Sequence, residues 1–252
     1  MILLILILAL IVRLIGSNQS LWLDEAAQLM ESVRPLKYQL DIQADFQPPL
    51  FHLILHYWLY LSRNEIILRL LPIFLGIATI YVAYLLFKEL FNQKIALITS
   101  ILLSLSPFHV WYSQEIRPYS LSALMGMLTT YFLFKKKATG YIITAILAIY
   151  STYFTPFLLM AHGIYLYLYQ KQYFRKWCIS MMVVFVFFLP WCPFFFKQLS
   201  AGKGLINLLP GWDQAVSVSV IKALPLIFVK FILGIFKFRR FFFLKKCVVK
   251  VY

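Results

Sequence analysis

Long uninterrupted apolar runs recur along this chain and limit what it can fold into. These runs do not alternate apolar and polar residues, as the strands of a membrane barrel do. A helix satisfies its own backbone hydrogen bonds in lipid, so such runs are typical of membrane helices. The chain is 62% hydrophobic and 13% charged, whereas soluble domains are about 45–50% apolar. We therefore expect an all-α, polytopic membrane protein and exclude an ordinary soluble domain.

About eight spans are expected, because a transmembrane helix needs about 20 apolar residues. The first is a short, uncleaved span over residues 1–15, with Arg13 reaching out from its end to the membrane surface. Pro156 provides a break that would divide residues 141–169 into a helical hairpin. The remaining spans are expected at residues 70–87, 95–112, 119–134, 141–158, 159–169, 177–196 and 216–236.

Basic residues lie in alternate connectors between the apolar runs, which accounts for much of the net charge of +15. This pattern indicates membrane orientation and not nucleic-acid binding, because short cytoplasmic connectors carry an excess of Lys and Arg. The opposite, extracytoplasmic side then holds residues 16–69, 113–117 and 197–213. The connectors assigned to the cytoplasm contain Lys88 and Lys94; Lys135, Lys136 and Lys137; Lys171, Arg175 and Lys176; and Lys237, Arg239 and Arg240.

The predicted organisation has four parts. Residues 1–15 form the first transmembrane helix, residues 16–69 an extracytoplasmic catalytic loop, and residues 70–240 a transmembrane helical module. Residues 241–252 are a basic aromatic tail without helical patterning, which suggests a truncated chain or a shifted reading frame. Within the loop, residues 21–33 and 48–61 are expected as helices lying in the membrane interface. Pro48 and Pro49 suit the start of the second, where a missing N–H costs little.

Five of the nine acidic residues lie between residues 20 and 49. Asp24 and Glu25 follow the apolar Leu21-Trp22-Leu23, so their carboxylates would lie at an apolar rim. Such a carboxylate has a raised proton affinity and suits a general base for a hydroxyl acceptor. The alternative is an acidic first helical turn that complements the helix dipole. The residues alone leave both interpretations open.

A second charged group lies in the short connector around Glu115 and Arg117, expected on the same side as Asp24. Arg117 suits a phosphate oxygen, and Glu115 an acceptor or the arginine itself. A surface ion pair at a helix end is the alternative. Arg69 is a further cation on this side and suits an anionic substrate group.

Metal binding is not required by the sequence. His52 and His56 have the i, i+4 spacing of a metal pair, but they lie among Leu, Tyr and Trp without an HExxH glutamate. Packing in the interfacial helix is the favoured interpretation. Asp45 would be an added ligand if a divalent metal is used, and this is left open. The three cysteines show no CxxC spacing and favour neither a disulfide framework nor a thiolate site.

The order of several motifs resembles the GT-C superfamily of membrane glycosyltransferases. The relevant strings are Leu21-Trp22-Leu23-Asp24-Glu25, Asp45 with Pro48-Pro49-Leu50-Phe51, Arg69-Leu70-Leu71-Pro72, Ser106-Pro107-Phe108, and Trp111 to Tyr119 (WYSQEIRPY). They are similar to family 39, the protein O-mannosyltransferase and lipid A aminoarabinose transferase type. The resemblance covers about residues 1–170. Members are usually longer, so this chain is identified as a truncated member.

The resemblance implies an inverting glycosyltransferase that takes a sugar from a polyprenyl-phosphate donor at the outer face. Asp24 would be the catalytic base, with Glu25 and Glu115 as the other acids of the catalytic site. Substrate contacts are expected from Asp45, Gln47, Arg69, Arg117 and Tyr119; at Gln47 relatives often carry His or Lys.

The expected partners are the lipid-linked sugar, a lipid, glycan or protein acceptor, and membrane lipids, with no nucleic acid. The expected location is a bacterial or archaeal plasma membrane, with the site facing outside. Two other functions are considered: a membrane transporter or lipid flippase, and an inactive truncated fragment. A transporter should carry carboxylates in mid-membrane, whereas here they lie almost entirely in loops.

Overall fold

The structure, a computed structural model, describes residues 1–40 and 46–208, with side chains to residue 201. Asp45, the expected span at residues 216–236 and the tail at residues 241–252 therefore lie outside the described residues. The chain divides into two units, Met1–Gly202 and Lys203–Tyr252. Everything below concerns the first unit, apart from the last turns of its final helix.

The described residues are all-helical, as expected, and contain no strand. Two 3₁₀ turns, Leu36–Tyr38 and Leu189–Trp191, join α-helices. The α-helices are α1 (Ile2–Leu14), α2 (Leu23–Val33), α3 (Leu50–Trp58), α4 (Glu65–Leu90), α5 (Gln93–Leu105), α6 (Pro107–Gln114), α7 (Tyr119–Phe134), α8 (Ala138–Ile149), α9 (Thr155–Tyr169), α10 (Lys171–Phe188) and α11 (Cys192–Leu208).

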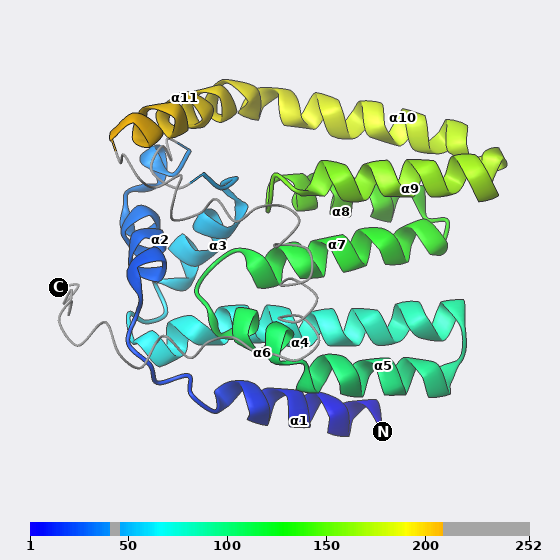
Figure 1. Ribbon diagram of the computed structural model, residues 1–252, viewed down its shortest axis with the longest axis horizontal. Helices are drawn as coiled ribbons and strands as arrows, with labels where there is room; N and C mark the ends of the chain where they lie inside the picture. The colour runs from blue at the N-terminus through cyan, green and yellow to red at the C-terminus, as the bar shows by residue number, and fades with distance from the viewer. Residues whose placement is uncertain (41–45, 209–252) are drawn as a thin grey trace. The chain divides into compact units, whose positions relative to one another are not determined.

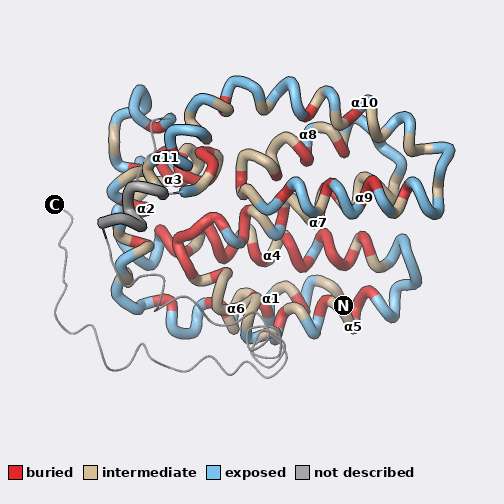
Figure 2. Tube along the Cα trace, turned by 45° about the horizontal axis from the view of Figure 1, so that its top comes forward, coloured by how far each residue is buried: buried red, intermediate tan, exposed pale blue. Residues whose placement is uncertain are grey.

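The long helices lie side by side, and α2 and α3 pack at one end of them (Figure 1). Helix α4 is central, since it packs against α5, α6 and α7, and much of it is buried (Figure 2). A buried apolar cluster joins α2, α3, α4 and α7, with Phe51, Leu55, Leu68 and Ile116 at its centre. Burying each such side chain contributes about 1.5–3 kcal/mol. This cluster fixes α2 against α4 and so supports the site described below.

Two helical segments are long and apolar enough to cross a membrane: Glu65–Leu90 and the continuous Lys171–Ala201. Helices α5 and α6 form a third candidate if the pair, bent by 59°, is counted as one broken span. The most apolar stretch of Glu65–Leu90 is 56% buried, against 17% for Lys171–Ala201, so α10 and the start of α11 present mostly apolar surface outward. These helices make the protein an integral membrane protein, whereas the predicted count of about eight spans stays a prediction.

Several expected helix limits are corrected by the structure. Residues 95–112 are not one helix, because the chain bends at Ser106 where Pro107 interrupts the backbone hydrogen bonds. The expected helix at residues 141–158 ends at Ile149, and α9 begins at Thr155 with Pro156 in its first turn. The hairpin that Pro156 indicated is thus confirmed. Helix α7 begins and ends where it was expected.

Successive connectors lie at opposite ends of the long helices, so the basic connectors after α4 and α7 share one end, as expected (Figure 1). At one end Lys135 forms an ion pair with Glu89 at 2.5 Å, and Lys136 lies 4.8 Å from the centre of the Tyr173 ring. At the other end Leu50 N donates to the Tyr150 carbonyl, which ties the α3 start to the α8–α9 connector. The side of the membrane on which each end lies stays a prediction.

The expectation that Arg13 reaches out to the membrane surface is wrong. Its side chain is 0% exposed, and its guanidinium donates to the carbonyls of Ala9 and Ser104 at 3.0 and 3.2 Å. It also donates to His109 Nδ1 at 2.6 Å. Arg13 therefore joins α1 to the bend between α5 and α6.

Candidate active site

The first turn of α2 carries the two adjacent acids, Asp24 and Glu25. The helix begins here because Glu25 Oε2 accepts from the backbone N–H of Trp22 at 3.2 Å, which satisfies one of the donors left open at a helix start. Both acids also complement the positive end of the helix dipole. The dipole interpretation and a chemical role are therefore compatible at this position.

Glu25 is fully buried and accepts hydrogen bonds at both carboxylate oxygens. Arg69 on α4 donates from two terminal nitrogens, Nη1 to Oε1 at 2.6 Å and Nη2 to Oε2 at 2.9 Å. The backbone N–H of Ile116 donates to Oε1 at 3.0 Å. A buried charge is tolerated only when it is paired and hydrogen-bonded in this way. The geometry thus gives Glu25 a positioning role, in which it joins α2 to α4 and to the α6–α7 connector.

Arg69 is 2% exposed and donates to two backbone carbonyls besides Glu25. Nη1 donates to the Gln114 carbonyl at 2.6 Å, and Nη2 to the Gln19 carbonyl at 3.2 Å. Both terminal nitrogens are therefore directed at protein acceptors. Contact between Arg69 and substrate stays a prediction that this geometry does not favour.

Asp24 differs from its neighbour Glu25. It is half-buried, and within the described part of the chain no hydrogen bond or ion pair engages its carboxylate. Its backbone carbonyl accepts from Arg117 Nη1 at 3.4 Å. The Arg117 guanidinium therefore lies beside the first turn of α2. The structure thus brings together Asp24 and Arg117, which are 93 residues apart.

Glu115 and Arg117 lie in the connector between α6 and α7, and Tyr119 is the first residue of α7. Glu115 is 3% exposed and Arg117 8% exposed, so neither is an ordinary surface charge. Tyr119 is 37% exposed, and its ring packs edge-on against Tyr112 with centroids 4.7 Å apart. The connector is thus built into the protein, although its contact with a substrate stays a prediction.

Gln47 lies three residues before α3 and contacts Gln198 on α11. Its backbone carbonyl accepts from Gln198 Nε2 at 3.1 Å, and Gln198 Oε1 accepts from Tyr153 at 2.5 Å. Burial raises the pKa of Tyr153 to about 12, against a smaller lowering by the hydrogen bond that Trp191 donates. Gln47 therefore contributes its backbone to the packing of α11, and a substrate contact from its side chain stays a prediction.

The two histidines of α3 are buried and hydrogen-bonded to α2. Gln28 Nε2 donates to His52 Nδ1 at 2.7 Å, and His56 Nδ1 donates to the Ser32 carbonyl at 2.8 Å. These contacts hold α3 against α2. In the part of the chain that the structure describes, no three His, Cys, Asp or Glu side chains gather as metal ligands.

Three residues that support the site through hydrogen bonds were not predicted as site residues: Gln114, His109 and the buried Arg13. Gln114 bridges the end of α1 and the Arg69 guanidinium. Its place in the string from Trp111 to Tyr119 was a usable signal, since it directly precedes Glu115. Arg13 and His109 meet across 96 residues, and no local pattern shows this contact.

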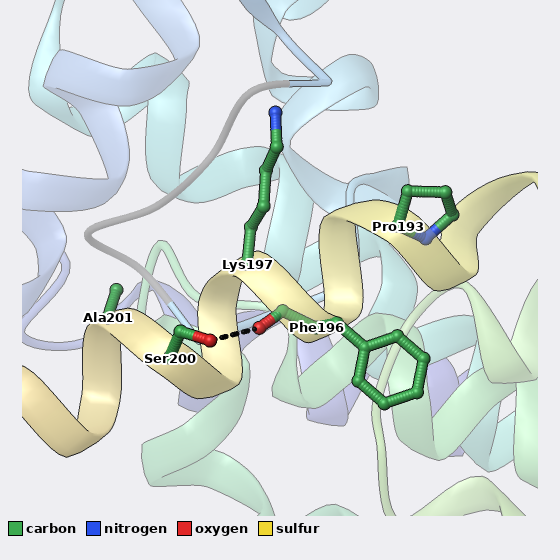
Figure 3. Close-up of a pocket in the computed structure, with 5 residues that line it drawn as sticks. All are labelled: Pro193, Phe196, Lys197, Ser200 and Ala201. Atoms are coloured by element: carbon green, nitrogen blue, oxygen red, sulfur yellow. Dashed lines mark hydrogen bonds between the residues drawn. The ribbon is translucent and has the colours of Figure 1, made fainter.

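A shallow hollow lies on α11, outside the cluster of acids and arginines (Figure 3). Its volume is about 530 Å³, and Lys197 projects from the same helix face. Ser200 Oγ donates to the Phe196 carbonyl one turn earlier in the helix, at 3.0 Å. Among the residues that the structure describes, the hollow is lined by Pro193, Phe196, Lys197, Ser200 and Ala201, all from one helix, and no predicted site residue of that part lines it.

The apolar helices define an integral membrane protein, and Glu25, Arg69 and Arg117 gather around the first turn of α2. Residues 46–194 match the protein family described as dolichyl-phosphate-mannose-protein mannosyltransferase. This match covers more than half of the 252-residue chain, so the protein belongs to that family of membrane glycosyltransferases, as its motifs indicated. The matched region contains Arg69, Glu115 and Arg117. Searches of curated proteins and of solved structures give no significant match.

Proposed function

We propose that this protein is an inverting glycosyltransferase that moves a sugar from a polyprenyl-phosphate donor to an acceptor hydroxyl or phosphate on the extracytoplasmic side of the membrane. Family membership supports the reaction class and the type of donor. The observation that carries the site assignment is the contrast between two adjacent acids. Glu25 is buried and paired with Arg69, whereas the half-buried carboxylate of Asp24 has no donor among the described residues.

Asp24 is assigned as the general base. Its carboxylate takes the proton of an acceptor hydroxyl while the acceptor oxygen forms a bond to the anomeric carbon. On the opposite face of the sugar, the bond from that carbon to the phosphate oxygen breaks, and the bonding electrons leave with the polyprenyl phosphate. One displacement inverts the anomeric configuration. A positioned base of this kind contributes about 10²–10⁴-fold to the rate.

Arg117 is assigned to the departing phosphate. Its guanidinium lies beside the α2 turn that carries Asp24, with Nη1 3.4 Å from the Asp24 carbonyl oxygen. A planar guanidinium binds two phosphate oxygens at once, and a buried cation stabilises developing negative charge more strongly than an exposed one. Glu115 and Tyr119 flank Arg117 and complete the proposed substrate-binding connector.

The reaction is tested with purified protein in lipid vesicles that contain a radiolabelled polyprenyl-phosphate sugar. Transfer of label to an acceptor with inverted anomeric configuration, read by NMR, supports the proposal. Movement of intact lipid-linked sugar between leaflets, without a new glycosidic bond, would instead support a flippase. No change in the labelled lipid in the presence of a range of acceptors would contradict the transferase assignment.

The outer-face assignment is tested by labelling single cysteines in sealed cells with a membrane-impermeant maleimide. Asn18 lies near the site and Lys137 at the opposite end of the helices, and both are exposed. The proposal predicts that Asn18→Cys is labelled in intact cells and Lys137→Cys only after lysis. The reverse pattern would place the site in the cytoplasm.

A further inference from the structure

We propose that Gln114 is a positioning residue that holds the linker between α1 and α2, residues 15–22, and through it the base at Asp24. This inference rests on the proposed function for its catalytic readout. Gln114 Nε2 donates to the carbonyls of Arg13 at 2.9 Å and Ile15 at 2.7 Å. Directly after Ile15, Gly16 turns the chain away from the helix axis with φ +79°. The side-chain amide of Gln114 therefore binds the chain at the point where α1 ends and the linker begins.

The last carbonyls of a helix have no donor within the helix and need one from elsewhere. The side-chain amide of Gln carries two N–H donors on one nitrogen, so it can donate hydrogen bonds to two nearby carbonyls at once. Methionine has a similar length and no such donor, and aspartate or glutamate in the ionised form only accepts. Glutamine is thus suited to this position by its chemistry as well as its length.

The backbone of Gln114 also contacts the ion pair of Arg69 and Glu25, through Arg69. Its carbonyl accepts from Arg69 Nη1 at 2.6 Å, while Arg69 Nη2 donates to the Gln19 carbonyl at 3.2 Å. At the end of the linker, Trp22 N–H donates to Glu25. The linker is therefore held at its start by Gln114, in its middle by Arg69 and at its end by Glu25. Asp24 lies two residues beyond the last of these contacts.

The first helix in turn holds the element that carries Gln114. Pro107 has no N–H, so the carbonyl of Leu103 lacks its normal donor four residues ahead. Arg13 donates to this carbonyl at 3.5 Å and to that of Ser104 at 3.2 Å. It thereby stabilises the 59° bend that directs α6 toward the site. Arg13 of α1 thus satisfies carbonyls at the end of α5, directly before α6, and Gln114 of α6 satisfies carbonyls at the end of α1.

The discriminating substitution is Gln114→Met, which keeps the side-chain length and the backbone carbonyl that Arg69 needs. Without the two side-chain donors the linker moves, and displacement of a reacting group by about 1 Å costs on the order of 10²-fold in rate. We expect kcat to fall by about 10- to 100-fold, with KM for the lipid-linked donor changing less than about threefold. The control is Gln170→Met, since Gln170 donates to Tyr165 at the opposite end of the helices. It should change neither parameter.

A second readout does not depend on activity. In protein lacking its native cysteines, new cysteines are introduced at the exposed Asn18 and Ala123 and spin-labelled. The distance between the two labels then reports the position of the linker relative to α7. The inference predicts one narrow distance distribution in the parent protein and in Gln170→Met, and a broadened or shifted one in Gln114→Met. That result supports the positioning role of Gln114 even if Asp24→Asn retains transfer. The positioning role and the assignment of Asp24 as the base can therefore be contradicted separately. An unchanged distribution in Gln114→Met, or a loss of transfer confined to KM, would overturn the inference.

Discussion

Arg69 meets Glu25 through two hydrogen bonds, of 2.6 and 2.9 Å, and the two side chains are 2% and 0% exposed. The residues are 44 positions apart and belong to α4 and α2. Their contact joins the central helix to the short helix that carries Asp24. The pair therefore is a structural connection between α4 and α2, while the catalytic role is proposed for Asp24.

Breaking this pair from either side should destabilise the protein strongly. Glu25→Gln or Arg69→Met leaves the other charge buried and unpaired, which typically costs about 3–5 kcal/mol. The double variant should lose less than the sum of the two, because no unpaired charge remains. The free energy of unfolding in detergent measures this. The control is Glu89→Gln, which removes the partly exposed pair with Lys135 and should cost much less; equal losses would contradict the buried-pair account.

A methyl group at Gly76 should displace α6. A Cβ there would lie 2.4 Å from Ser113 Oγ, two residues before Glu115. Overpacking of this kind costs about 1–3 kcal/mol, and the shift of α6 should also lower transfer. Gly76→Ala is compared with Gly126→Ala, whose Cβ would meet only the end of the Leu158 side chain at 3.3 Å. Similar unfolding and transfer in both variants would contradict the close approach of α4 and α6.

The buried hydroxyl of Tyr153 should make stability fall at high pH. Burial raises its pKa to about 12, above the value of about 10 for unfolded tyrosine. A raised pKa contributes stability that is complete below pH 10 and is lost as the pH rises toward 12. The free energies of unfolding of the parent protein and Tyr153→Phe should therefore converge over this range. A difference that stays constant from pH 8 to 12 would contradict the burial of this hydroxyl.

Local patterns in the sequence predicted the helices better than the contacts between them. Helix α7 coincides with the expected range because Pro118 and the lysines after Phe134 limit it on both sides. The expected helices at residues 21–33 and 48–61 appear as α2 and α3. The Arg13 contacts were missed because the acceptors arise where Pro107 breaks a helix about 90 residues later.

The local sequence pattern places Asp24 and Glu25 alike at an apolar rim, and the fold separates them. Successive residues on a helix differ by about 100° in direction, so Glu25 is turned to Arg69 while Asp24 remains at the side of α2. The partner of Glu25 follows from the packing of α2 against α4, which depends on apolar contacts such as Leu29 with Leu68 in one cluster. The local pattern therefore does not show the different surroundings of the two acids, which arise only in the assembled fold.

The most direct test of the account is the rate of sugar transfer by Asp24→Asn. Asparagine keeps the size of the side chain but cannot accept the acceptor proton, so kcat should fall by about 10²–10⁴-fold while the protein inserts and unfolds like the parent. The matched control is Glu31→Gln, which removes one negative charge from the same helix, where Glu31 pairs with Arg34, and should retain transfer. Parental kcat in Asp24→Asn would contradict the assignment of Asp24 as the base.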